Sequence, residues 1–407
     1  MPHVSQIANA LVWEKFQKGS LMKWMVPVNS LDAVQMRAID QIVENPEKNH
    51  WVKGFAGSGK TIVLTHVLQR LASERPTPKV CFATFTHALK DMVETGLPQS
   101  AISKIEFCTL HKIGGLRGKF DVVVADELQD IPTRLLEKFR EKGTSVVFAA
   151  DFDQSIHIGS TTEALLKATI KPVKEHQLKE IHRINENVFH VATCVYRSAS
   201  VLDDQLVRVD DKNTFLHKAK SQSEEFVTMF KEAVRVASKE YPSAIAFPNR
   251  ALIDQFILCI SKEKKFRGTP PSVKAKSERS SDEYVNPFDP VNEYLISNSS
   301  ELRCFGSGAG DLLEADKKKI VYLMTYSSVK GLDFANVFLP NLTSTTKLDP
   351  MVSAKDINER RMFFVATTRA RERLYMSYTG EPHRFIREIE EIDDELLVKF
   401  TGKATSW

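Results

Sequence analysis

The chain has 407 residues, of which 42% are hydrophobic and 27% are charged, and its formal net charge at pH 7 is +4. This length suggests two or three domains with real hydrophobic cores, and the composition is ordinary for a globular protein. The small net charge does not by itself indicate nucleic-acid binding, although cations need only line a groove to matter. No apolar run is long enough to span a membrane.

The five cysteines are scattered and form no C-x-x-C pair. This spacing argues against a zinc or iron–sulfur site and against a disulfide framework. The N-terminus has no basic leader followed by an apolar core, so no secretory signal is expected. These features fit a reducing, cytoplasmic setting.

The first half of the chain predicts a parallel sheet. Residues 1–26 are expected to form a helical lead-in that packs onto the main body, with partner docking as the alternative. From residue 51 onward, short apolar runs alternate with amphipathic stretches, which is typical of strand–helix alternation. The expected strands are 51–52, 80–83, 122–125 and 146–149, and the expected helices include 61–71 and 133–142.

A second series of the same kind predicts a second α/β domain. Its expected strands are 244–247, 320–324, 337–339 and 374–376, and its expected helices are 224–238 and 358–367. We place the two domains at residues 27–168 and 169–384. Residues 262–316 have little periodicity and are interpreted as a long loop or small insertion, and residues 385–407 as a helical tail.

A phosphate-binding loop is predicted between the first strand and the first helix. The segment Gly54-Phe55-Ala56-Gly57-Ser58-Gly59-Lys60-Thr61 fits G-x-x-x-x-G-K-[ST]. Its glycines let backbone N–H groups surround phosphate oxygens, and the helix start adds a positive dipole end. Lys60 would reach the β- and γ-phosphates, and Thr61 would hold Mg²⁺. The alternative is a glycine-rich turn that matches the pattern by chance. The predicted strand before the segment and the predicted helix after it argue against this alternative.

A pair of carboxylates ends the apolar strand at 122–125. Asp126 suits a hold on Mg²⁺, and Glu127 suits the base that activates an attacking water. A polar strand end at a turn is the alternative, but it explains one acidic residue more easily than this pair after a phosphate loop.

The segment Asp126-Glu127-Leu128-Gln129-Asp130 resembles the D-E-x-Q-D motif of UvrD/Rep/PcrA-like superfamily 1 helicases. The other family motifs follow in the family's order. Residues 31–35 resemble the Q motif, 83–88 motif Ia, 109–111 motif Ib, 151–156 motif III, 178–183 motif IV, 323–334 motif V and 359–370 motif VI. The resemblance therefore covers nearly the whole chain and implies two RecA-like P-loop NTPase domains with parallel sheets flanked by helices.

The resemblance also implies roles in ATP binding and hydrolysis. Gln35 would contact adenine, and Gln154 would sense the γ-phosphate. Arg183 and Arg369 would face the γ-phosphate as cations, because arginine is always charged and can fork onto oxygens. Surface salt bridges are the alternative for both arginines. The remaining expected ATP-binding positions are Ile62, His182, Gly331 and Asp333.

A single-strand track is implied by the same resemblance, because hydroxyls, cations and aromatics commonly hold single strands. Phe85 is the candidate stacking residue, with a core aromatic as the alternative. For His111, a structural hydrogen-bonding role is as plausible as contact with the single strand. The basic stretch at 262–279 is interpreted as a solvated loop. The expected track residues are Thr84, Phe85, Thr109, His111 and Thr325.

Several departures from the family pattern bear on function. Only nine residues separate His111 from Asp121, so the family's inserted subdomain has no room there. Ile62 and His182 stand where the family has an arginine and a tyrosine around adenine, and Ser327 replaces the motif V histidine. These departures weaken the prediction of duplex unwinding more than the prediction of translocation along a single strand.

We expect a DNA-stimulated ATPase that translocates 3′→5′ on single-stranded DNA, in repair, recombination or anti-phage defence. The alternative is an ATP-controlled DNA-binding switch subunit that regulates a partner such as a nuclease. An RNA-directed enzyme ranks third, because backbone contacts do not distinguish the two nucleic acids in sequence.

Overall fold

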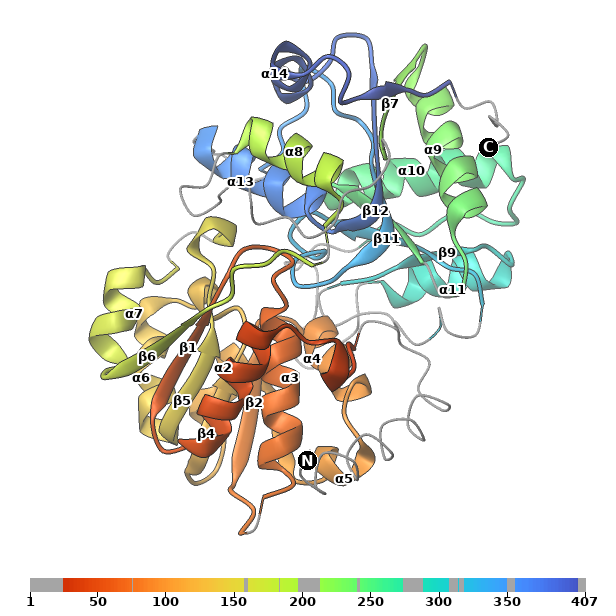
Figure 1. The fold of residues 1–407 in the computed structure, drawn as a ribbon. Coiled ribbons are helices and arrows are strands. Elements are labelled where there is room, and N and C mark those ends of the chain that lie inside the picture. The colour runs from red at the N-terminus through yellow and green to blue at the C-terminus, as the bar shows by residue number, and fades with distance from the viewer. Residues whose placement is uncertain are drawn as a thin grey trace. The chain divides into compact units, whose positions relative to one another are not determined.

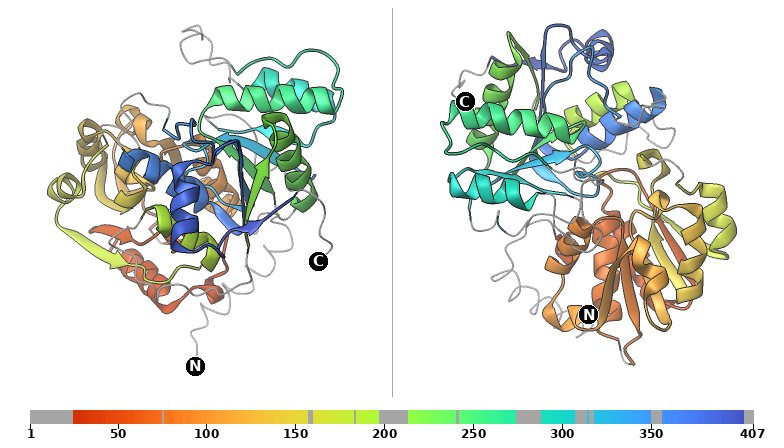
Figure 2. Two further views of the ribbon diagram at one scale, coloured as in Figure 1. Left: turned by 90° about the horizontal axis from the view of Figure 1, so that it is seen from above. Right: turned by 180° about the vertical axis from the view of Figure 1, so that it is seen from behind.

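The computed structural model describes residues 25–74, 76–156, 160–182, 184–196, 213–239, 242–273, 288–306, 314, 318–349 and 356–401. The chain forms two compact units, residues 1–179 and 180–407 (Figure 1). Each unit is a sheet with helices on its faces (Figure 2). The expected lead-in falls almost wholly outside the described residues. Along the described parts of the chain, no helix has both the length and the hydropathy needed to cross a membrane.

The sheet of unit 1 has six strands, all paired in parallel. In spatial order they are β3 (Ile105–Thr109), β2 (Val80–Thr84), β4 (Phe120–Ala125), β5 (Gly143–Ala149), β1 (Asn49–Lys53) and β6 (Val173–Gln177). Because β1, β5 and β4 are neighbours, the loops after these three strands meet at one edge of the sheet.

Helices cover both faces of this sheet, because its central strands are apolar on both sides. On one face, α6 (Thr133–Lys142) and α7 (Glu163–Thr169) pack on a core that includes Trp51. Alternate strand residues such as Phe82 point to the opposite face, where α3 (Lys60–Leu71) packs. The remaining described helices are η1 (Val28–Ser30), α2 (Ala33–Glu44), α4 (His87–Thr95), α5 (Gln99–Ile102), η2 (Leu110–Gly115), η3 (Leu128–Asp130) and η4 (Phe152–Gln154).

The sheet of unit 2 has seven strands, again all parallel. In spatial order they are β13 (Val398–Lys399), β7 (Thr214–Ala219), β12 (Ala370–Thr379), β11 (Phe334–Leu339), β8 (Ser243–Phe247), β10 (Val321–Thr325) and β9 (Leu302–Cys304). Its described helices are α8 (Glu186–Val195), α9 (Gln222–Val236), α10 (Arg250–Glu263), α11 (Asp289–Ser297), α13 (Asp356–Thr367) and α14 (Arg384–Ile392).

A buried carboxylate joins α9 to the carboxyl ends of two strands in unit 2. Glu225 accepts hydrogen bonds from Asn341 N at 2.5 Å, Ser377 Oγ at 2.7 Å and Thr379 Oγ1 at 2.7 Å. Three donors satisfy the carboxylate without a buried cation among them, which is what a carboxylate away from water requires.

The structure confirms two α/β domains with parallel sheets and corrects three details. The predicted division after residue 168 is too early, because β6 pairs with β1 and so belongs to unit 1. Residues 262–316 are not wholly irregular, because they contain α11 and β9, and β9 pairs with β10. Within the described part of the tail, which ends at residue 401, α14 is followed by β13, which joins the sheet beside β7.

Candidate nucleotide-binding site

The loop between β1 and α3 has the backbone that the glycine pattern predicts. Gly57 and Gly59 have φ angles of 83° and 86°, and Gly59 is the N-cap of α3. Gly54 has no such φ, but a Cβ there would lie 2.3 Å from Ser58 Oγ and 3.0 Å from Leu178 Cβ. The loop thus wraps closely before the helix, and the first N–H groups of α3 face the space that a phosphate would need.

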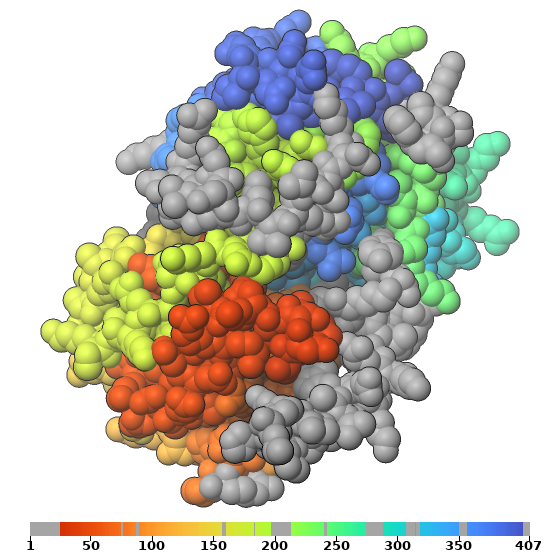
Figure 3. Space-filling model, in the orientation of Figure 1, coloured from red at the N-terminus to blue at the C-terminus, as the bar shows by residue number. Residues whose placement is uncertain are grey.

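Gln35 packs against this loop from α2. Asp32 and Gln35 form a capping box at the start of α2, in which Gln35 Oε1 accepts from Asp32 N at 3.1 Å. Gln35 Nε2 donates to Ser58 O at 3.0 Å. Although α2 lies at the surface of unit 1 (Figure 3), the Gln35 side chain is only 4% exposed. The Gln35 side chain therefore supports the loop through its hydrogen bond to Ser58 O. The contact of Gln35 with adenine stays a prediction.

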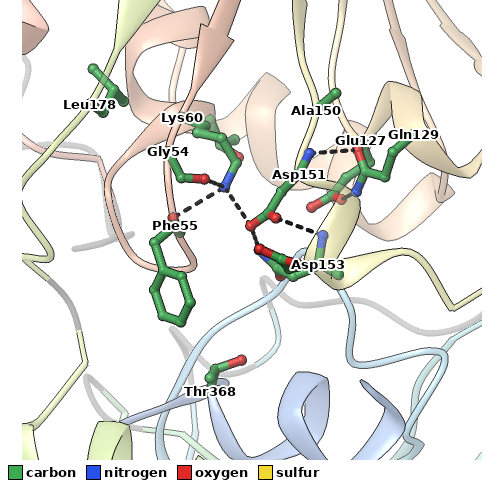
Figure 4. Close-up of polar contacts among 12 residues, drawn as sticks. Gly54, Phe55, Lys60, Glu127, Gln129, Ala150, Asp151, Asp153, Leu178 and Thr368 are labelled. Carbon is green, nitrogen blue, oxygen red and sulfur yellow. Dashed lines mark hydrogen bonds and ion pairs between the residues drawn. The ribbon is translucent and has the colours of Figure 1, made fainter. Parts of the chain in front are cut away.

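Lys60, at the start of α3, points back into the loop. Its Nζ donates to Gly54 O at 2.8 Å and to Phe55 O at 3.1 Å, and it lies 3.4 Å from Asp151 Oδ2 (Figure 4). Asp151 follows β5, so its carboxylate pairs the loop lysine with the neighbouring strand end. Gln154 Nε2 donates to the same Asp151 Oδ2 at 2.5 Å.

Thr61 and Asp126 meet across the gap between α3 and β4. Thr61 Oγ1 donates to Asp126 Oδ2 at 2.6 Å. Burial, together with the charge of the adjacent Glu127, raises the pKa of Asp126 to about 6, although Thr61 and Lys60 oppose the shift. A divalent cation would stabilise the ionised form of this buried carboxylate, because it supplies the charge that burial removes from water.

Glu127 turns its carboxylate toward the loop after β5. Its φ of 57° lies in the left-handed region, which few non-glycine residues adopt, and its side chain is 8% exposed. Gln129 Nε2 donates to Glu127 Oε2 at 2.5 Å, and Gln129 Oε1 accepts from Asp151 N at 3.1 Å. No separate role is predicted from the sequence for Gln129 or for Asp151. The sequence signal for each is its place in a family motif.

These residues fit a magnesium-bound nucleoside triphosphate. Ser58 Oγ is buried within the loop and has no hydrogen-bond partner among the described residues. The loop supplies backbone donors and Lys60 supplies a cation, which suits phosphate oxygens, while a hydroxyl and a carboxylate suit Mg²⁺. Two other expected members of the set, Ala56 and Ile62, lie in the loop and in the first turn of α3.

Several residues of unit 2 are expected at the ATP site, and the structure shows their contacts within unit 2. Arg369 Nε donates to Val365 O at 3.0 Å and Nη2 donates to Thr368 Oγ1 at 3.1 Å, so the guanidinium sits at the carboxyl end of α13. Phe334 N donates to Arg369 O at 3.0 Å, which brings the segment with Gly331 and Asp333 beside it. Their approach to the phosphate loop stays a prediction.

The predictions for His182 and Arg183, which both lie in motif IV, have different outcomes. His182 Nε2 lies 3.8 Å from Glu180 Oε2 within unit 2. Arg183 lies outside the described residues, so its expected role as a second cation stays a prediction.

The structure brings four of the expected single-strand residues to one edge of the first sheet. Thr84 and Thr109 end the paired strands β2 and β3, and the rings of Phe85 and His111 meet edge to face with centroids 5.8 Å apart. Phe85 is half-buried and His111 is exposed, whereas both threonines are buried. In unit 2, Thr325 Oγ1 lies 3.0 Å from Ser327 Oγ and 2.8 Å from Ser328 Oγ.

Comparison with known proteins matches both halves of the chain. Residues 30–220 match a family model described as an AAA domain, and residues 307–381 match a UvrD-like helicase C-terminal domain. Over 111 residues the chain is 36% identical to the ATP-dependent DNA helicase PcrA of Staphylococcus epidermidis, a match that covers 23% of this chain and 14% of that protein. It is 33% identical over 95 residues to a probable DNA helicase II homolog of Mycoplasma pneumoniae, covering 20% and 13%.

A likeness to solved structures extends over more of the chain at lower identity. The structure of S. cerevisiae Dbp5 bound to RNA and ADP BeF3 has a TM-score of 0.49 and 13% identity, and the match covers 91% of this chain and 90% of that one.

Two parallel sheets, a phosphate loop with a paired Asp–Glu, a match to an AAA domain and a match to a UvrD-like helicase C-terminal domain are together the features of a helicase-type P-loop fold. In these matches the chain is similar to the UvrD/PcrA-like superfamily 1 helicases.

Proposed function

We propose that the chain hydrolyses ATP at the carboxyl edge of the first sheet and uses it to move 3′→5′ along single-stranded DNA. One observation carries the proposal: hydrogen bonds and an ion pair connect the loop lysine to the strand ends after β4 and β5 through Asp151 and Gln129. A site in which binding and hydrolytic groups already contact one another suits phosphoryl transfer, where catalysis is mostly positioning and charge stabilisation.

Each group has a role that its chemistry supports. Lys60 and the N–H groups of the loop bind phosphate oxygens. Thr61 and Asp126 would hold Mg²⁺, which neutralises charge on the phosphates when it is bound. Glu127 accepts the proton of the attacking water, and Gln154 contacts the γ-phosphate from the loop after β5. Arg183 and Arg369 add cations that face the γ-phosphate, so hydrolysis depends on domain closure.

Single-stranded DNA is the proposed track. Half-buried Phe85 and exposed His111 form an aromatic pair at the carboxyl edge of the first sheet, and base stacking on such side chains does not depend strongly on sequence. Likeness to DNA helicases supports DNA over RNA. The proposed setting is DNA repair, recombination or anti-phage defence.

An ATP-controlled switch that binds DNA and regulates a partner such as a nuclease is the second candidate. The observation that favours it is the short connection between β3 and β4: residues 110–119, all described, contain η2 and no inserted subdomain. Such a switch would change its affinity for DNA with the nucleotide state but would not travel along the strand.

Displacement of streptavidin from biotinylated single strands separates these candidates. A 3′→5′ translocase releases streptavidin from the 5′ end in the presence of ATP, and Glu127→Gln abolishes the release. Release from the 3′ end alone would reverse the proposed direction. Nucleotide-dependent DNA binding without release from either end would favour the switch, and activity on RNA but not DNA would move the track to RNA.

A further inference from the structure

Gln129 forms a bridge between the two strand ends that carry the hydrolytic groups. Its side chain is buried, and its amide makes one contact in each direction. Nε2 donates to Glu127 Oε2 at 2.5 Å, while Oε1 accepts from Asp151 N at 3.1 Å (Figure 4). The two ends of one amide thus join the residue after Asp126 to the loop after β5.

The other contacts of Asp151 extend this bridge to the nucleotide. Asp151 Oδ2 lies 3.4 Å from Lys60 Nζ and accepts from Gln154 Nε2 at 2.5 Å. Asp151 Oδ1 accepts from Asp153 N at 3.1 Å, which fixes the turn of η4. A change at Lys60 or Gln154 therefore reaches Glu127 through the Asp151 backbone and a single glutamine.

We infer that Gln129 is a positioning residue, which holds the Glu127 carboxylate and makes its orientation depend on the loop after β5. The inference rests on the proposed hydrolysis at this site. Glu127 has a φ of 57°, a strained conformation that a non-glycine residue keeps only where its surroundings hold it, and the contact with Gln129 is part of those surroundings. A donated hydrogen bond to a buried carboxylate is strong and directional, so it fixes the oxygen that would meet the water.

Two substitutions separate the two contacts of Gln129. Gln129→Glu keeps an oxygen that can accept from Asp151 N but replaces the donor to Glu127 with a second carboxylate. Gln129→Met keeps a side chain of similar size and loses both contacts. Gln99→Met, on the exposed surface of α5, is the matched control.

The expected result is a lower kcat for ATP hydrolysis in both Gln129 variants, by roughly 10- to 100-fold, as when the supporting partner of an active-site ligand is lost. The KM for ATP and the affinity for a fluorescent Mg·ADP analogue should stay within about twofold of wild type, because the described hydrogen bonds of the Gln129 side chain go to Glu127 and Asp151 and not to the loop or Thr61. Combining Gln129→Met with Glu127→Gln should give the rate of Glu127→Gln alone, because both changes act through one group.

Three outcomes would overturn the inference. The first is a Gln129→Glu variant that hydrolyses ATP like wild type while Gln129→Met is impaired, which would leave only the contact with Asp151. The second is a loss of Mg·ADP binding in both variants, which would make Gln129 a folding residue. The third is wild-type kcat in both. Failure of the proposed function is a separate result, since wild type itself would then hydrolyse no ATP or match Glu127→Gln.

Discussion

Asp151 holds the loop lysine and a neighbouring amide with the same carboxylate oxygen. Lys60 Nζ is 3.4 Å from Asp151 Oδ2, and Gln154 Nε2 donates to that atom. To reach phosphates, Lys60 must exchange this carboxylate for phosphate oxygens. We therefore expect the pair to oppose nucleotide binding, while the same oxygen holds Gln154, the residue proposed to contact the γ-phosphate.

Asp151→Asn should accordingly tighten nucleotide binding and slow hydrolysis. Loss of the competing charge should lower the Kd for Mg·ADP by about threefold to tenfold, which corresponds to roughly 1 kcal/mol. The kcat should fall, because Gln154 loses an ionised acceptor. Titration with a fluorescent Mg·ADP analogue and steady-state kinetics measure both quantities. Weaker Mg·ADP binding in the variant would show that Asp151 supports the bound nucleotide instead of competing with it.

Much of the site could be predicted at the scale of single residues, and the missing part has a physical reason. Lys60, Thr61, Asp126 and Glu127 follow from motif position, because each stands at a strand end or helix start. The link through Gln129 depends on side-chain contacts between two loops that are far apart in sequence. No spacing rule in the sequence reports such a contact.

At the scale of elements, the phosphate loop and α2 are fitted to each other. Gly59 has a φ of 86°, and a Cβ on it would lie 2.5 Å from Gln35 Nε2. Gly59→Ala should therefore disturb both the loop conformation and the contact that Gln35 of α2 makes with the loop.

We expect Gly59→Ala to lower the free energy of unfolding of unit 1 by about 1 to 3 kcal/mol, the usual cost of a strained φ. Mg·ADP affinity should fall with it, because the first N–H groups of α3 shift. Urea denaturation and nucleotide titration test the two effects. Gly115→Ala is the matched control, since a Cβ there would meet nothing within 4 Å. Unchanged nucleotide affinity in Gly59→Ala would contradict this account of the loop.

The edge strand β6 is held to β1 by a buried histidine pair. His50 Nδ1 and His176 Nε2 lie 2.9 Å apart, and their rings stack with centroids separated by 5.1 Å. Burial lowers the pKa of His176 to about 4, with the charges of His50 and Lys174 acting in the same direction. Burial also lowers the pKa of His50.

Unit 1 should lose stability in mild acid through this pair. Below pH 6.5 the unfolded chain binds protons that the folded histidines do not, so stability falls as the pH drops from about 6.5 toward 4, by up to roughly 3 kcal/mol for His176. His176→Gln should flatten this dependence, and His111→Gln, at an exposed position, is the control. Urea midpoints at pH 7 and pH 5 measure the slope. Equal slopes in wild type and His176→Gln would rule out the pair as a source.

The strands that the sequence did not predict are mostly edge strands. β6 is largely polar, and β9 and β13 are short, so none forms an apolar run. Parallel pairing with a buried neighbour makes them strands, and only the folded sheet supplies that neighbour. The central strands β1, β4 and β8 were predictable because burial on both faces demands apolar residues.

At the scale of the whole molecule, the chain combines two α/β domains with a short connection between β3 and β4. Residues 110–119 leave β3 and β4 joined by η2, so an inserted subdomain is absent from this described stretch. The matched relatives are far longer than the matched segments, which cover 14% and 13% of them. The activity of this chain therefore has to be measured on the chain itself.

The most direct measurement is the rate of ATP hydrolysis with and without single-stranded DNA, for wild type and Glu127→Gln. We predict hydrolysis that rises strongly with single-stranded DNA and is abolished by Glu127→Gln, while Mg·ADP binding is retained in the variant. Hydrolysis that ignores single-stranded DNA, or that survives in Glu127→Gln, would contradict the account of this chain as a nucleic-acid-driven ATPase with Glu127 as its base.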